Sequence, residues 1–90
     1  MTAAKFLSLT TSEVGTDFVA FEDSPCSIAN VWNLTGQSLT FKYANDAGTF
    51  VLPTGLAYAF CGLNNANQLR VKRSDESNTP VTLNSVEVEL

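Results

Sequence analysis

Residues 38–43, Ser-Leu-Thr-Phe-Lys-Tyr, alternate strictly between polar and apolar side chains, and turn-forming residues stand on both sides of them. Alternation with a period of two is typical of a β-strand that buries one face, because successive side chains of a strand point to opposite sides. Leu39, Phe41 and Tyr43 are therefore predicted to point into a core. This segment indicates an all-β chain.

Similar short segments separated by turn residues recur in both directions from this one. Strands are predicted at residues 5–9, 16–21, 26–32, 38–43, 49–52, 56–61, 68–73 and 81–90. Short strands at such spacing favour a compact antiparallel β-sandwich or small β-barrel of seven to eight short strands. In the last strand, the apolar positions change parity at Asn84 and Ser85, which predicts a β-bulge or a bend there. The predicted core comprises Phe18, Phe21, Trp32, Leu39, Phe41, Phe50, Leu52, Phe60, Leu69 and Val88.

The length and composition are consistent with this fold. Ninety residues allow one small domain; we assign residues 16–90 to a single β domain and residues 1–15 to an N-terminal arm or edge strand. Charged residues make up only 16%, while the chain holds ten Thr, eight Ser and eight Asn. These short polar residues are poor helix formers, so the composition argues against a helical bundle.

The charge pattern argues against two classes of partner. The net charge is −4, whereas proteins that bind nucleic acids usually carry a basic patch. The cluster of Arg70, Lys72 and Arg73 is interpreted as a solvated strand end rather than a phosphate site. An acidic chain with no long apolar run is also not expected to bind or cross a membrane. The N-terminal residues show no export signal, so we expect synthesis in a cytoplasm.

The residues needed for most catalytic chemistries are not present. The chain has no His, which excludes Ser-His-Asp and Cys-His constellations. Its two pairs of adjacent acids, Glu22 with Asp23 and Asp75 with Glu76, lie in turn-like polar stretches and are interpreted as solvated loop residues. We therefore predict a protein that is not an enzyme and that holds no cofactor and no metal ion.

Three other features each have two interpretations. Cys26 and Cys61 could form a disulfide if oxidised, but a secreted scaffold of this size usually has four or more cysteines, so we favour two reduced thiols that are buried in the core or half-buried. The triplet that begins at Asn33 matches a glycosylation acceptor and is interpreted as a turn. Aromatic residues that could stack on a sugar but are more simply core or interface residues are Trp32, Tyr43 and Tyr58.

The remaining features favour assembly with other protein chains. Short, uncharged polar side chains lose little rotamer entropy when they are ordered at an interface. The N-terminal arm and the Val-rich C-terminal strand are each predicted to add to a neighbouring sheet edge, with Glu87 and Glu89 facing water. The residues predicted to contact partners are Phe6, Leu7, Val86 and Val88. We also expect a homo-oligomer, since oligomerisation stabilises a domain with a thin core.

Three stretches resemble small β-domains among the virion proteins of tailed bacteriophages. They are residues 28–40 (IANVWNLTGQSLT), 52–55 (LPTG) and 62–73 (GLNNANQLRVKR). The resemblance implies a non-enzymatic structural protein of the virion, with the major capsid protein or other virion proteins as partners. Its most concrete form is a capsid decoration (cement) protein that binds the outer shell and stabilises it. The alternatives are a tail, fibre or baseplate component and a small carbohydrate-binding module.

Overall fold

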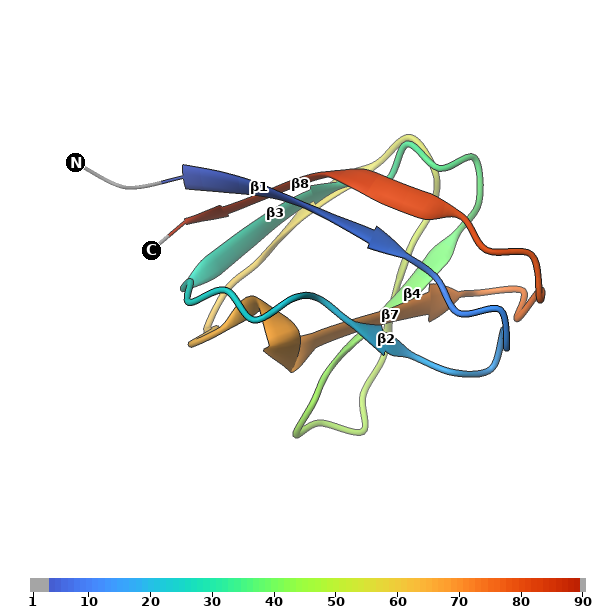
Figure 1. The fold of residues 1–90 in the computed structure, drawn as a ribbon, viewed down its shortest axis with the longest axis horizontal. Helices are drawn as coiled ribbons and strands as arrows, with labels where there is room; N and C mark the ends of the chain where they lie inside the picture. The colour runs from blue at the N-terminus through green and yellow to red at the C-terminus, as the bar shows by residue number, and fades with distance from the viewer. Residues whose placement is uncertain (1–3, 90) are drawn as a thin grey trace.

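Eight strands form two four-stranded antiparallel sheets that face each other (Figure 1). The computed structural model describes residues 4–89, so the expectations for residues 1–3 and for Leu90 lie outside the described residues. The strands are β1 (Ala4–Thr10), β2 (Val19–Ala20), β3 (Ile28–Trp32), β4 (Leu39–Tyr43), β5 (Phe50–Leu52), β6 (Ala57–Phe60), β7 (Leu69–Arg73) and β8 (Thr82–Glu89). A single turn of 3-10 helix, η1 (Ala66–Gln68), precedes β7.

The strand order identifies the type of sandwich. Sheet A has the order β1-β8-β3-β6 and sheet B the order β2-β7-β4-β5. The chain changes sheet at every connection except the β4–β5 hairpin. Eight antiparallel strands connected in this way form a jelly roll. The predicted β-sandwich is confirmed, and the two sheets remain separate rather than closing into a barrel.

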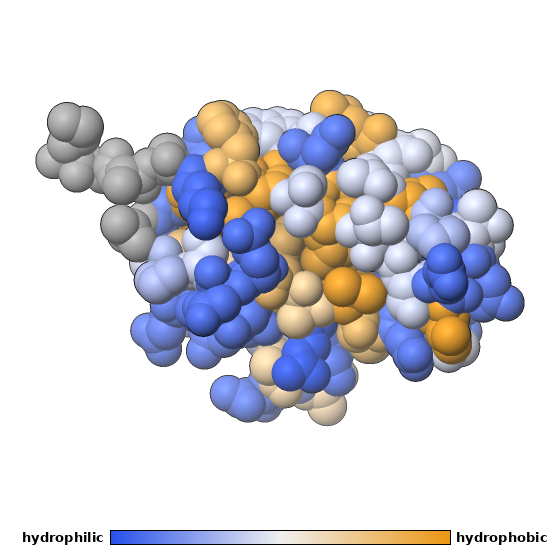
Figure 2. Space-filling view, viewed as in Figure 1, coloured by the Kyte–Doolittle hydropathy of each residue, from blue (hydrophilic) through white to orange (hydrophobic). Residues whose placement is uncertain are grey.

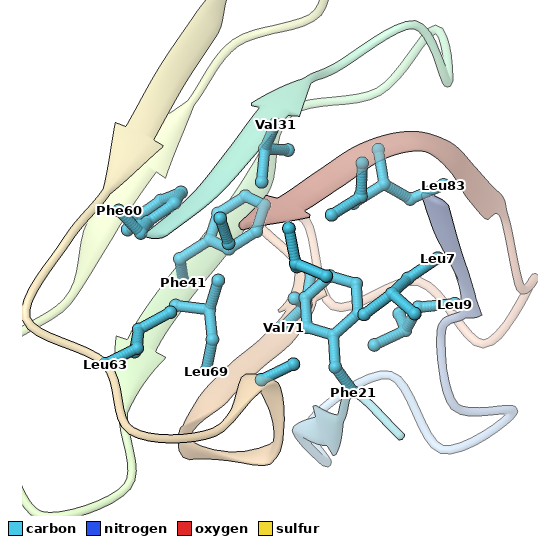
Figure 3. Close-up of a cluster of buried hydrophobic side chains, with 14 of the residues drawn as sticks. Leu7, Leu9, Phe21, Val31, Phe41, Phe60, Leu63, Leu69, Val71 and Leu83 are labelled. Carbon is cyan, nitrogen blue, oxygen red and sulfur yellow. The ribbon is translucent and has the colours of Figure 1, made fainter. Parts of the chain in front are cut away.

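Side chains from both sheets meet in one core (Figure 3). The predicted core residues that are buried are Phe21, Leu39, Phe41, Leu52, Phe60, Leu69 and Val88. Trp32 was placed wrongly: the inward side of β3 carries Ala29 and Val31, so Trp32 points outward and is 47% exposed. Phe50 has the inward parity but lies on the edge strand β5 and is 40% exposed, while Phe18 is half-buried.

The predicted bulge in the last strand is confirmed. Leu7 pairs with Val86 and Leu9 pairs with Leu83, so two steps along β1 correspond to three steps along β8. The extra residue lies within Asn84–Ser85, where the apolar parity changes. The bulge lets Leu83 and Val86 both point into the core, at exposed fractions of 1% and 0%.

Asn33 joins the two turns at one end of the sandwich. Its side-chain amide donates to the carbonyl oxygens of Gln37 and Leu52, both at 2.8 Å. Its Oδ1 accepts bonds from the backbone N–H and the hydroxyl of Thr35. Its backbone carbonyl accepts the Gly55 N–H. Asn33 is fully buried, so the turn interpretation of this triplet is confirmed.

The loop at residues 74–80 is held by Arg73, which was expected to be a solvated strand end. Arg73 is instead 8% exposed. Its guanidinium donates to both carboxylate oxygens of Asp75, at 3.0 and 2.7 Å, and to the carbonyl oxygen of Thr79 at 2.8 Å. Hydrogen bonds from Arg73, and next from the Ser77 backbone N–H, lower the pKa of Asp75 from its ordinary value.

The Asp75→Asn variant is expected to lose part of the pH dependence of stability. A carboxyl whose pKa is lower in the folded state stabilises the fold above its unfolded pKa, and this contribution disappears as pH falls through the folded pKa. The difference in unfolding free energy between wild type and variant should therefore be largest at neutral pH and shrink below about pH 4. Urea denaturation across this range measures it, with Glu13→Gln as the exposed control. A constant difference would contradict the role assigned to this pair.

Candidate functional site

The predicted partner contacts require correction. Leu7, Val86 and Val88 are buried in the core, with exposed fractions of 3%, 0% and 3%. The strand that carries Val86 and Val88 is not an edge strand, because β8 lies between β1 and β3. The edge strand beside β8 is β1, and its Phe6 is 73% exposed. Of the four predicted residues, only Phe6 presents its side chain on the surface.

The register places Phe6 in a continuous row on the outer face of sheet A. Phe6 pairs with Glu87, Glu87 with Asn30, and Asn30 with Ala59. Two residues after Asn30 on the same face of β3, Trp32 pairs with Ala57 of β6. We call this surface the outer face of sheet A and define it by Phe6, Asn30, Trp32, Ala57, Ala59 and Glu87. Figure 2 views the molecule from the side of the edge strands β1 and β2, so the apolar side chains in its middle lie between the two sheets, and the outer face of sheet A is seen only from its edge.

This outer face has the composition of a protein contact surface. Trp32 borders a shallow hollow of about 210 Å³ whose floor includes the exposed Ala57 and Ala59. Tryptophan is enriched among the residues that dominate binding energy, and alanines allow another backbone or side chain to approach closely. Glu87 is the charged group within the patch. The face therefore suits an apolar partner surface that also carries a cation.

A second concave surface lies where the edge strands β5 and β6 face each other. This aromatic groove has a volume of about 310 Å³. Its aromatic lining residues are Phe41, Tyr43, Phe50, Tyr58 and Phe60. The ring centroids of Phe50 and Tyr58 are 4.5 Å apart, and Phe60 stacks on Phe41 at 4.8 Å. The groove brings together two of the predicted sugar-stacking residues, Tyr43 and Tyr58, while Trp32 lies outside it.

The two tyrosines have different environments. Tyr43 donates its hydroxyl to the Cys61 carbonyl oxygen at 2.5 Å and is partly buried. Burial, and next the negative charges of Cys61 and Tyr58 when ionised, raise the pKa of Tyr43. Tyr58 is 46% exposed. Tyr43 therefore fixes the wall of the groove, and Tyr58 presents its ring to solvent.

The outer face of sheet B is basic. Lys42 and Lys72 place their ammonium groups 5.0 and 5.1 Å from the centre of the Phe18 ring, and Arg70 pairs with Lys42. Cations over an aromatic ring are attracted by its negative face. Glu76 neutralises part of this charge through a 2.9 Å ion pair with Lys72. The two outer faces of the sandwich thus differ in charge.

The two cysteines are not bonded to each other. Both cysteines are free thiols, Cys26 buried and Cys61 exposed, so the alternative of a disulfide is not realised, and the expected burial holds for Cys26 alone. Burial raises the pKa of Cys26.

Each predicted solvated acid has a polar partner. Those at 22–23 contact Lys5 and Asn65, and those at 75–76 contact Arg73 and Lys72. Within residues 4–89, no three or more potential metal ligands come together.

Two further observations concern the chain as a whole. In the part of the chain that the structure describes, no helix has the length and apolar character needed to cross a membrane. Comparison with known protein families, with curated proteins and with solved structures finds no match for this chain. Any functional conclusion therefore rests on its own residues.

Proposed function

We propose that this protein is a non-enzymatic structural component of a virion, most concretely a capsid decoration protein that binds the outer shell through the outer face of sheet A. The observation that carries the proposal is the exposure of two large aromatic side chains on one sheet face. Phe6 is 73% and Trp32 is 47% exposed, and small residues lie beside Trp32. Exposed apolar patches of this kind mark sites of protein association.

Two observations support the virion context. Two of the stretches that resemble phage virion proteins meet in space, because Asn33 bonds to the Leu52 carbonyl oxygen and the Gly55 N–H. The Gly36 N–H also donates to the Thr54 hydroxyl. In addition, the jelly roll is an architecture used by viral capsid domains. Because one fold serves many functions, the surface carries more weight than the topology.

The mechanism would be stabilisation by binding. A capsid shell expands when the genome is packaged. A protein that binds only this expanded shell lowers the free energy of the intact, expanded shell relative to that of the disrupted shell. Repetition over many copies allows each individual contact to be modest. Glu87 lies in the same row as Phe6, so the matching shell surface is expected to be apolar and to carry a Lys or Arg.

Heat treatment of particles that lack this chain tests the proposal. These particles should release their genome at a lower temperature, and added wild-type protein should restore the higher temperature. Trp32→Ala and Phe6→Ser should each weaken binding to the shell by about thirtyfold or more, because aromatic residues that dominate an interface contribute roughly 2 kcal/mol or more. Val51→Ser, which changes an exposed residue of β5, is the matched control. Absence of binding and of stabilisation by the wild-type protein would overturn the proposal.

A further inference from the structure

We propose that the aromatic groove between β5 and β6 is a binding site for a pyranose ring of an uncharged glycan. This function is separate from attachment to a shell, and it concerns a different side of the sandwich. The groove opens between two edge strands, whereas the outer face of sheet A is centred on β3 and β8.

The rings of Phe50 and Tyr58 form a rigid platform. Phe50 comes from sheet B and Tyr58 from sheet A, and their exposed fractions are 40% and 46%. Behind them lies Phe60, with its centroid 4.8 Å from Tyr58 and 5.9 Å from Phe50, both in edge-to-face geometry. Phe60 is in turn stacked on the fully buried Phe41. The two solvent-exposed rings are therefore held in place by buried rings. Their side chains lose little conformational entropy when a ligand binds.

Polar groups at the rim suit hydroxyl groups. Asp46 and Thr49 line the groove together with Tyr58. The Asp46 Oδ1 accepts the Gly48 N–H at 2.9 Å, which fixes the carboxylate within its turn and leaves Oδ2 to accept from a ligand. Lys42 also lines the groove, but its ammonium lies over the Phe18 ring on the outer face of sheet B. The charge at the rim is thus negative, which disfavours anionic ligands.

A pyranose ring matches these features in size and chemistry. One of its faces presents aliphatic C–H groups that can pack on an aromatic ring, and its edge carries hydroxyls that donate to a carboxylate. The volume of about 310 Å³ lies at the lower end of the range for ligand sites. The groove would hold one or two sugar units, and its open side would let a longer glycan continue into solvent.

NMR titration of the isotopically labelled, full-length protein tests the inference. The probes are cellotriose, maltotriose and N-acetylchitotriose at millimolar concentrations, with trigalacturonate as the anionic counterpart. At least one neutral trisaccharide should shift resonances of Phe50, Tyr58 and the 45–49 turn, and trigalacturonate should not. Phe50→Ala and Asp46→Asn should each raise the Kd about tenfold or more. Asn at position 46 keeps the acceptor for the Gly48 N–H, so the turn is retained.

Two variants serve as controls and separate this inference from shell attachment. Phe6→Ala and Val51→Ser change exposed apolar side chains that do not line the groove, and they should leave glycan affinity unchanged. Shifts confined to the outer face of sheet A, or no shift with any neutral trisaccharide, would overturn the glycan site while leaving shell attachment intact. Loss of shell binding in Phe50→Ala, without any glycan binding, would also overturn it and would assign the groove to a protein contact.

Discussion

Replacing Asn33 with alanine is expected to lower the free energy of unfolding by about 2 kcal/mol or more, because the hydrogen bonds of a fully buried amide are lost and each buried polar group left without a partner costs roughly 1–3 kcal/mol. The Asn33 amide donates to the carbonyl oxygens of Gln37 and Leu52, both at 2.8 Å, and the Gln37 oxygen keeps a second bond, from the Thr35 hydroxyl at 3.0 Å. The Thr35 backbone N–H also loses its acceptor, the Asn33 Oδ1. Urea denaturation followed by circular dichroism measures the effect.

Asn45→Ala is the matched control for this variant. Asn45 is exposed and lies in the turn that follows β4. The change there should stay within about 0.5 kcal/mol, as is usual for surface positions. An Asn33→Ala variant with near-wild-type stability would show that the two turns are held by something other than this amide.

The second large effect is expected at Gly15, where alanine should destabilise the fold by about 3 kcal/mol or more through backbone displacement. A Cβ atom at this position would overlap the carbonyl oxygens of Glu76 and Ser77. The Gly15 N–H also donates to the Asn78 side chain at 3.0 Å. Alanine would therefore separate two loops that are far apart in the sequence. Thermal unfolding followed by circular dichroism gives the size of the loss.

Gly48→Ala provides the comparison for this second prediction. Its nearest new contact would be the Asp46 side chain, at 3.3 Å from the added Cβ, and a side chain can move at little cost. We expect a change of about 1 kcal/mol or less at this position. Equal losses at the two glycines would mean that the contact between the Gly15 loop and the loop at 74–80 does not limit stability.

The features of the fold that the sequence predicted are those encoded by local periodicity. The parity of Leu39 and Phe41 identifies the inner side of β4, and the change of parity at Asn84 and Ser85 locates the bulge. Trp32 shows where periodicity fails. Its strand has apolar residues on both faces, so local pattern does not determine which side is buried. Val31 occupies the core because it pairs with Val86 of β8, and this pairing involves residues 55 positions apart.

The candidate surfaces were harder to predict, because each depends on contacts between distant strands. Phe50 and Tyr58 meet across the gap between the sheets, and Phe6 joins the row of Asn30 through β8. The alternation of apolar and polar residues predicts that Phe50 and Tyr58 point inward. It does not indicate that β5 and β6 are edge strands, where inward side chains stay partly exposed. The place of Asp46 at the rim of the groove follows from the β4–β5 hairpin, which brings its turn beside Tyr58.

We propose that this protein acts by attaching to the outside of a shell through one sheet face. A cryo-electron microscopy reconstruction of shells incubated with the purified protein tests this attachment. Regular density is expected on the outer surface, in hundreds of copies, with Phe6 and Trp32 against the shell and the β5–β6 side free. Bare shells, density restricted to the tail, or density with the outer face of sheet A turned toward solvent would contradict it.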